Sequence, residues 1–150
     1  MDAVTLRSTR FGELEIPAEA VLEFPNGLIG LGGSRYTLLA RSDDAMFVWL
    51  HSVDDPGIAI PLTNPWKFYE DYAVELSDAD EERLGITDPA AAQVYVTVRA
   101  AEAIEDFTAN LRAPILLVSG RGFQVINQVP GSPVRTPLVA GAPDNAGQAA

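Results

Sequence analysis

The sequence of 150 residues contains no cysteine, and this absence excludes disulfide bonds, thiolate metal sites and cysteine nucleophiles. Histidine occurs once, at His51, which leaves little basis for a histidine metal site. The longest apolar run that is not alanine-rich, Ala113–Val118, is far too short to span a bilayer. The first ten residues also lack the apolar stretch of a secretory signal. We therefore expect a cytoplasmic protein that does not contact membranes.

Basic residues are also scarce. Lys and Arg number 10 against 21 Asp and Glu, so the formal net charge is −11 at pH 7. A protein of this charge is repelled by phosphate backbones and by anionic membrane surfaces. We therefore expect no direct binding to nucleic acid, whereas a basic protein partner would be attracted to the molecule.

The end of the chain differs in composition from the rest. The length and the hydrophobic content of 47% are typical of a single globular domain. After Val129, however, residues 130–150 are rich in Pro, Gly and Ala and contain no aromatic side chain. Such a segment buries too little apolar area to offset the entropy lost on ordering. We predict a folded domain over residues 1–129 and a flexible tail over residues 130–150, whose first few residues lie along the domain.

Alternating hydrophobic residues predict a strand-rich domain. Val94, Val96 and Val98 place three β-branched side chains on one face of a strand. A period of two, or a short buried run, also occurs at residues 13–16, 46–50, 58–62, 115–118 and 123–126. Gly120 can adopt the positive φ of a two-residue hairpin turn between the last two of these segments. This pattern indicates roughly eight to ten short strands in a mainly β barrel or sandwich.

Only one segment has a convincing helical pattern. Ser77 is a favourable N-cap, and acidic residues follow it in the first turns, where the helix dipole favours negative charge. Gly85 can end the helix in the left-handed conformation. We therefore expect one short helix between Ser77 and Gly85.

No residue pattern supports catalysis or metal binding. His51 and Ser52 are adjacent, but neighbouring strand residues point to opposite faces, so they cannot pair as base and nucleophile. The acidic residues that begin at Asp78 match the start of a calcium loop, but Arg83 stands where that loop needs glycine. We expect a protein without enzymatic activity, cofactor or bound metal, in which His51 is structural.

Negative charge is concentrated between Glu70 and Glu82, a stretch that contains no basic residue. One interpretation is a solvated helix start that follows an exposed strand. The other is a docking surface for a basic partner, although some of its aromatic anchors must fill the core. The candidate anchors are Trp66, Phe68, Tyr69 and Tyr72. For the second interpretation, the candidate residues are Glu70, Asp71, Asp78, Asp80, Glu81 and Glu82.

Several short motifs occur in order along the chain. They are F-P-x-G-x-x-G at residues 24–30, W-L-x-S-x-D-x-P at 49–56, N-P-x-x-F-x-x-D-Y at 64–72, an acidic helix at 76–84, and T-x-N-L-x-A-P-I at 108–115. In this order they resemble the motifs of the FliW family of flagellar assembly factors. The resemblance extends from about Phe11 to Ile126, which is most of the predicted domain.

The resemblance implies a compact antiparallel β-barrel-like fold and a regulator rather than an enzyme. FliW-like proteins bind the translational repressor CsrA, relieve its repression of flagellin synthesis, and bind flagellin as an alternative partner. CsrA and flagellin are thus the partners that the resemblance implies for this chain. The last motif makes Asn110, Leu111 and Pro114 candidates for a partner surface, although Asn110 could equally satisfy backbone groups at a strand end.

Two other classes of function stay open at the level of the sequence. A small-ligand or hydrolytic β-barrel requires an enclosed pocket with converging polar groups. A structural subunit of a larger acidic assembly requires a large apolar patch exposed on the isolated chain.

Overall fold

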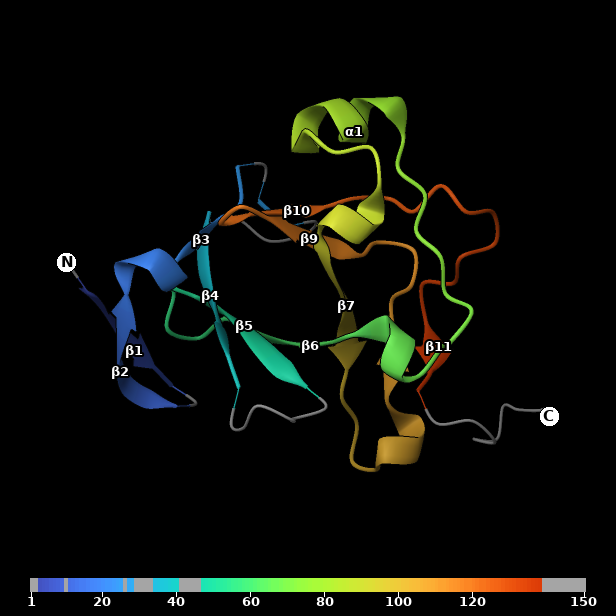
Figure 1. Cartoon of the computed structure of the whole chain (residues 1–150). Coiled ribbons are helices and arrows are strands. Elements are labelled where there is room, and N and C mark those ends of the chain that lie inside the picture. Colours follow the sequence, from blue (N-terminus) through green and yellow to red (C-terminus); the bar gives the residue numbers. More distant parts are fainter. Residues whose placement is uncertain (1–2, 10, 26, 29–33, 41–46, 139–150) are drawn as a thin grey trace.

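Strands dominate the computed structural model, which describes residues 3–9, 11–25, 27–28, 34–40 and 47–138 (Figure 1). In chain order the strands are β1 (Ala3–Ser8), β2 (Gly12–Pro17), β3 (Leu22–Glu23), β4 (Arg35–Leu39), β5 (Val48–Ser52), β6 (Ala59–Thr63), β7 (Gln93–Arg99), β8 (Thr108–Ala109), β9 (Ile115–Val118), β10 (Arg121–Gln124) and β11 (Thr136–Pro137). The helices are α1 (Asp78–Leu84) and the short 3-10 helices η1 (Ala18–Ala20), η2 (Pro65–Lys67), η3 (Pro89–Ala91) and η4 (Ile104–Asp106). The predicted mainly β fold with a short helix is confirmed.

Strand pairing closes the large sheet into a barrel. The hydrogen-bonded order is β7-β6-β5-β4-β3-β10-β9, and β9 pairs back onto β7. These pairings are antiparallel except that between β10 and β3, which is parallel. The predicted barrel is therefore confirmed, but its sheet is mixed rather than wholly antiparallel. The parallel pair arises because ring closure joins β3 to β10, whose direction the β9–β10 hairpin has already set.

A tight turn joins β9 to β10 where the ring closes. The turn consists of Ser119 and Gly120, with φ angles of 51° and 80°. Positive φ at both positions is typical of a type I′ hairpin turn, as the sequence predicts for Gly120. Further along β10, a Cβ added to Gly122 would lie 2.3 Å from the ring of Phe24. Glycine is required at this position because the Phe24 ring occupies the space of a side chain.

Hydrophobic side chains cover both faces of the barrel wall. The interior is filled by Phe24, Leu28, Tyr36, Leu50, Leu62, Ile115 and Leu117. On β7, Tyr95 packs against this interior cluster, whereas Val94 and Val96 face two clusters on the other side of the strand. One of these outer clusters includes side chains next to and within α1. The wall at β7 is therefore buried from both sides, and α1 is fixed to the barrel through one of its outer faces.

The described residues after Val129 pack against the barrel. β11 pairs with β8, and the Leu138 side chain is 3% exposed. The Leu111 amide also donates a hydrogen bond to the Pro133 carbonyl at 3.0 Å. The first residues of the predicted tail thus lie along the domain as far as Leu138. Residues 139–150 lie outside the described part of the chain, so the flexibility of that end stays a prediction.

A second, two-stranded sheet lies beside the barrel. β1 and β2 form an antiparallel hairpin, and the Thr9 amide joins it to the Pro56 carbonyl at 3.1 Å (Figure 1). Across the described residues, no helix has the length and apolar character needed to cross a membrane. Asn26, Ile29 and Gly30 of the first motif and Met46 of the predicted 46–50 strand lie outside the described residues.

Candidate protein-binding surface

Helix α1 is attached to the barrel by its apolar side. Ser77 caps it by accepting a hydrogen bond from the Asp80 amide at 3.1 Å, and Gly85 ends it with a φ of 76°. Both ends therefore follow the sequence prediction. Leu76 and Leu84 are buried against side chains of β9 and β10. Figure 1 shows the helix lying over these strands at the top of the molecule.

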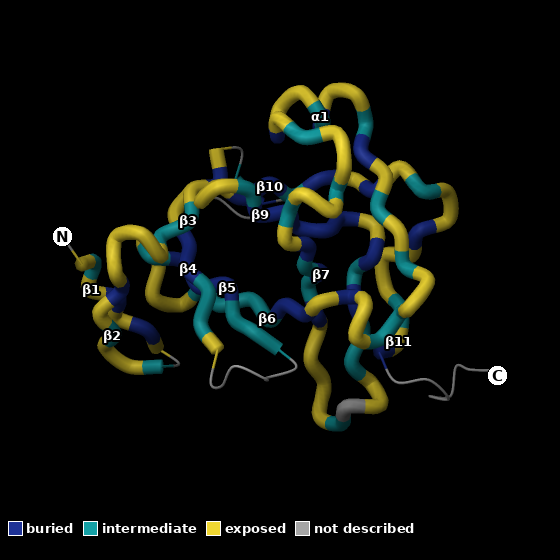
Figure 2. Tube along the Cα trace, viewed as in Figure 1, coloured by how far each residue is buried: buried dark blue, intermediate teal, exposed yellow. Residues whose placement is uncertain are grey.

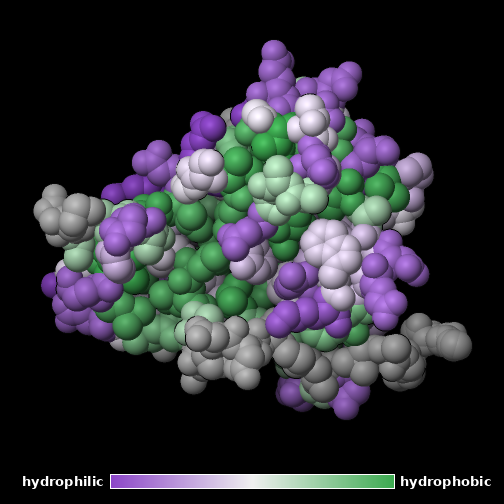
Figure 3. Space-filling view, in the orientation of Figure 1, coloured by the Kyte–Doolittle hydropathy of each residue, from purple (hydrophilic) through white to green (hydrophobic). Residues whose placement is uncertain are grey.

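The outward side of α1 is strongly negative. Asp78 and Glu82 are exposed and Glu81 is half-buried. Figure 2 shows that much of the α1 region is exposed or of intermediate burial. Figure 3 shows hydrophilic side chains gathered over this end of the molecule. Within the described chain, none of these three carboxylates takes part in an ion pair, so their charges are not neutralised. We call Asp78, Glu81 and Glu82 the acidic face of α1.

Asp80 differs from its acidic neighbours. The residue is 8% exposed, and its carboxylate forms an ion pair with Arg83 one turn later. A carboxylate that is turned inward and already paired contributes little to the field felt by an approaching partner. Asp80 therefore supports the helix rather than adding to its acidic face.

Glu70 and Asp71 lie apart from α1. Both are exposed in the turn after η2, and residues 73–77, which belong to no helix or strand, connect that turn to the helix. In Figure 1, η2 lies near β6 and β11, whereas α1 covers the opposite end of the barrel. The six predicted acidic residues thus form two groups rather than one continuous strip.

A buried amide holds the segment that leads to α1. Asn127 is 5% exposed, and its Oδ1 accepts hydrogen bonds from the amides of Glu75 at 2.9 Å and Val129 at 3.1 Å. Its Nδ2 donates to the Ala73 carbonyl at 2.8 Å. These bonds fix residues 73–75 to the chain beyond β10, and with them the position of α1. Nothing in the local sequence marks Asn127, because the glutamines 124 and 128 lie close by and its partners at Glu75 and Ala73 are 52 and 54 positions away.

The aromatic side chains near η2 are mostly structural. Phe68, Tyr69 and Tyr72 pack against the outer cluster that contains the β7 valines. The Tyr72 hydroxyl donates to the Leu111 carbonyl at 2.8 Å, and burial raises the pKa of Tyr72 to about 12. Trp66 is 40% exposed, with its Nε1 bonded to the Tyr72 carbonyl. Among the predicted aromatic anchors, Trp66 therefore offers the most accessible surface.

The last motif lies in the loop between β8 and β9. Oδ1 of Asn110 accepts hydrogen bonds from the amides of Arg112 at 3.0 Å and Ala113 at 3.2 Å. Leu111 is 7% exposed and Pro114 is buried, so both pack inward. Asn110 is half-buried and lines a cavity of about 530 Å³. Of the three candidates, Asn110 is the least buried, and its side chain shapes the loop.

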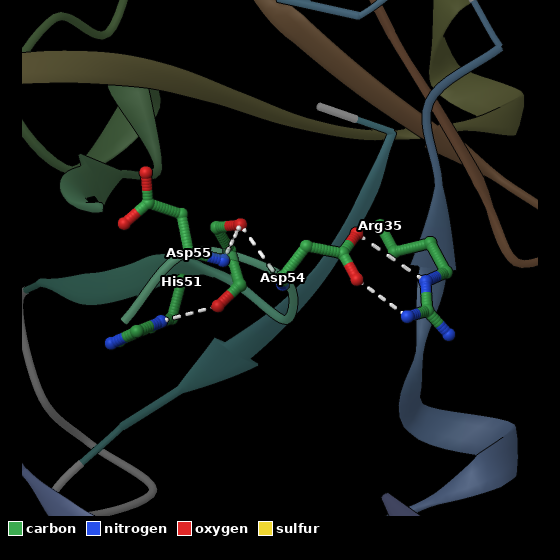
Figure 4. Close-up of polar contacts among 5 residues, drawn as sticks. Arg35, His51, Asp54 and Asp55 are labelled. Carbon is green, nitrogen blue, oxygen red and sulfur yellow. Dashed lines mark hydrogen bonds and ion pairs between the residues drawn. The ribbon is translucent and has the colours of Figure 1, made fainter. Parts of the chain in front are cut away.

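His51 makes polar contacts through both of its ring nitrogens, and Figure 4 shows the one made by Nδ1. Its side chain is fully buried, with Nδ1 2.7 Å from the Ser52 carbonyl and Nε2 2.8 Å from the Ser8 hydroxyl. Because a carbonyl oxygen only accepts, Nδ1 donates to the Ser52 carbonyl. In the neutral imidazole, Nε2 then accepts a hydrogen bond from the Ser8 hydroxyl. Ser52 Oγ instead accepts from the amides of Asp54 and Asp55. The predicted separation of the His51 and Ser52 side chains is confirmed, and the buried Ser8–His51 pair is closed to a substrate.

Comparison with known proteins decides the family. The chain matches the FliW protein family over residues 5–138. It belongs to the FliW family. The flagellar assembly factor FliW of Alkaliphilus metalliredigens is 40% identical over 114 residues, which cover 75% of this chain and 70% of that protein. The flagellar assembly factor FliW 2 of Desulfotalea psychrophila is 36% identical over 135 residues, which cover 87% of each.

A solved FliW structure shares this architecture. The crystal structure of the flagellar assembly factor FliW aligns with a TM-score of 0.80 at 28% identity, covering 89% of this chain and 96% of that one. The FliW resemblance expected from the motifs is therefore confirmed. The family is one of flagellar assembly factors and not of enzymes. The FliW match extends to Leu138, so it includes residues 130–138 of the predicted tail.

Proposed function

We propose that this FliW protein binds the translational repressor CsrA and relieves its repression of flagellin synthesis, and that it binds flagellin as an alternative partner. We place this activity in the cytoplasm, where translation is controlled. The observation that carries the proposal is the acidic face of α1, which presents Asp78, Glu81 and Glu82 without neutralising partners in the described chain. Family membership supports the proposal, because the members resemble one another in sequence and fold.

Charge supports CsrA as the first partner. An RNA-binding protein such as CsrA needs a basic working surface, and this chain carries a net charge of −11. Opposite charges on two proteins raise the rate of association and make the complex sensitive to salt. The acidic face of α1 concentrates that charge on a short helix held firmly against the barrel.

Relief of repression follows from the same charges. An acidic protein bound beside the RNA site of CsrA would repel the phosphate backbone and occupy part of the space that RNA needs. The antagonist therefore needs no resemblance to RNA. Such a mechanism requires exposed carboxylates on a rigid support, and α1 provides both.

The proposed partner residues fall into three sets. The acidic face of α1 is the primary set, and Glu70 with Asp71 forms a second set near η2. Asp80 would affect binding indirectly, by stabilising α1 through its ion pair with Arg83. The motif residues Asn110, Leu111 and Pro114 form the third set, in which Asn110 would contact a partner and the other two would hold its loop in place.

A charge-reversal experiment tests the primary set. The triple variant D78K/E81K/E82K should bind purified CsrA at least roughly tenfold more weakly than the parent, because three attractive contacts become repulsive. Its affinity should also change less between about 50 mM and about 300 mM salt, since screening acts on fewer favourable pairs. The double variant E70K/D71K measures the second set separately.

The matched control changes net charge equally at another place. Glu13, Glu19 and Glu105 are exposed and lie on β2, η1 and η4. The variant E13K/E19K/E105K should keep most of the CsrA affinity. The proposal fails if the control weakens binding as much as the α1 variant, or if the parent binds CsrA equally well at both salt concentrations.

Competition between flagellin and CsrA for the parent protein tests whether flagellin is an alternative partner. That part of the proposal fails if neither protein displaces the other.

A further inference from the structure

A cavity of about 530 Å³ lies at the barrel, and none of its lining residues belongs to α1. Its apolar floor, by which we mean Leu28 and Ile60, belongs to or packs against the interior cluster of the barrel. Ile115 also lines the cavity but is fully buried. Its sides come from β7, β8 and the residues that precede β11. This volume falls within the range of about 300–1,000 Å³ that is typical of small-molecule sites. The cavity is therefore large enough for a ligand and reaches an apolar part of the core.

Two arginines line the same cavity. Arg99 at the end of β7 and Arg135 before β11 are both exposed. Over the residues that the structure describes, neither guanidinium lies within ion-pair distance of a carboxylate. The chain has only 10 basic residues and a net charge of −11, so two cations at one cavity make its local charge opposite to that of the whole molecule.

Asn110 adds a neutral donor to this set. Both side-chain hydrogen bonds described for Asn110 use Oδ1, which leaves its Nδ2 protons to bind a ligand. Val134, which also lines the cavity, is 55% exposed and extends the apolar surface. The cavity thus combines an apolar floor with donors and positive charge, and the described lining contains no acidic residue.

We propose that this cavity binds a small amphiphilic carboxylate, with its charged group at Arg99 and Arg135 and its apolar chain against Leu28 and Ile60. Guanidinium groups bind carboxylates through paired, charge-assisted hydrogen bonds. A free small molecule fits better than a membrane lipid, because the net charge repels an anionic bilayer. The proposal goes beyond the binding of CsrA and flagellin and does not depend on either.

Three ligands that share a ten-carbon chain but differ in charge test whether the cavity or the net charge of the protein controls binding. Decanoate, decanol and decyltrimethylammonium would each be titrated below their micelle concentrations into the full chain, with binding followed by calorimetry and by amide NMR shifts. We expect decanoate to bind most tightly and to shift the amides of Arg99, Asn110 and Val134. Tighter binding of the cationic ligand would overturn the proposal, because it would show that net charge and not the cavity controls affinity.

Paired variants test the two arginines. R99Q/R135Q should weaken decanoate binding about tenfold or more while leaving decanol binding almost unchanged, because only the charged group loses its partners. The control R7Q/K67Q removes the same charge from β1 and η2 and should leave decanoate binding intact. V134D is a second variant, and it should fold because Val134 is exposed. It should also weaken decanoate binding, because it places a negative charge at the cavity. Equal decanoate affinities for R99Q/R135Q and R7Q/K67Q would refute the site, as would shifts at α1 instead of β7. Neither result would bear on CsrA binding.

Discussion

The barrel interior and the acidic face of α1 differ in the side chains that they contain and in how those side chains meet solvent. In the interior, Phe24 and Tyr36 are fully buried and their rings meet edge to face with centroids 5.2 Å apart. On α1, Asp78 and Glu82 extend into solvent, with no ion partner among the described residues. Interior side chains stabilise the fold through contacts, whereas α1 side chains determine the charge that a partner meets. The comparison separates the residues that hold the barrel from the residues available for recognition.

The largest loss of stability is expected from a substitution in the barrel interior. Phe24→Ala should lower the free energy of unfolding by about 3–5 kcal/mol, because it leaves a cavity between Tyr36 and Gly122. Urea denaturation followed by fluorescence measures the change. A loss below about 1 kcal/mol would mean that the interior can collapse around the missing ring.

The next largest loss of stability is expected at Asn127, which connects the barrel to the segment before α1. Asn127→Leu should cost about 2–3 kcal/mol, because it leaves the amides of Glu75 and Val129 and the carbonyl of Ala73 without their partner. Hydrogen exchange at α1 amides should quicken as well, since the segment leading to the helix is released. Gln128→Leu is the matched control, because Gln128 is exposed and, among the residues that the structure describes, its side chain bonds to the nearby Ile126 carbonyl alone. Equal losses for the two variants would contradict the anchoring role.

The end of α1 should show a smaller effect. Gly85→Ala places a Cβ on a residue with a φ of 76°, which costs about 1–2 kcal/mol even though the space around it is open. The control Gly57→Ala meets only one ordinary contact, with Asp55 at 3.6 Å, and should change stability little. Thermal unfolding of both variants gives the comparison. A neutral Gly85→Ala would show that the helix end can rearrange.

Alkaline pH should weaken the contact between η2 and the barrel. Burial raises the pKa of Tyr72 to about 12 and also raises the pKa of Tyr69, so the folded state favours the neutral hydroxyls. This stability is fully present below the unfolded pKa of about 10 and is lost as pH rises through about 12. Tyr72→Phe should flatten the fall in unfolding free energy over that window, whatever its effect at neutral pH. An unchanged slope would assign the alkaline loss to other groups.

The smallest effect on stability is expected on the acidic face itself. Asp78→Lys or Glu82→Lys should change the free energy of unfolding by no more than about 0.5 kcal/mol, because both side chains are exposed and unpaired in the described chain. Denaturation curves of the parent and variants measure this. A loss as large as that of Asn127→Leu would show that these charges support the fold and are not reserved for recognition.

Local patterns were enough to predict several elements. The valines at 94, 96 and 98 have the burial that their alternation predicts, and the cap residues Ser77 and Gly85 begin and end α1 as expected. The turn at Ser119 and Gly120 also follows from its sequence. Each of these features depends on residues a few positions apart, so the sequence contains the whole physical cause.

Other features depend on distant residues and could not be predicted in this way. The Ser8–His51 pair spans 43 positions, and the bond from Asn127 to the Ala73 carbonyl spans 54. The acidic run from Glu70 to Glu82 is continuous in sequence but is divided in space, because its two groups lie at η2 and at α1, near different ends of the barrel (Figure 1). Residues far apart in the chain also built the cavity that Arg99 and Arg135 share.

By itself, the sequence determined the strand-rich composition, the caps of α1, the negative charge and the family resemblance, because each is a property of single residues or of near neighbours. Only the tertiary structure decided which carboxylates face solvent, which polar groups are buried together, and how β3 and β10 close the barrel in parallel. The physical reason is that burial, pairing and ring closure depend on segments that come together only when the chain folds.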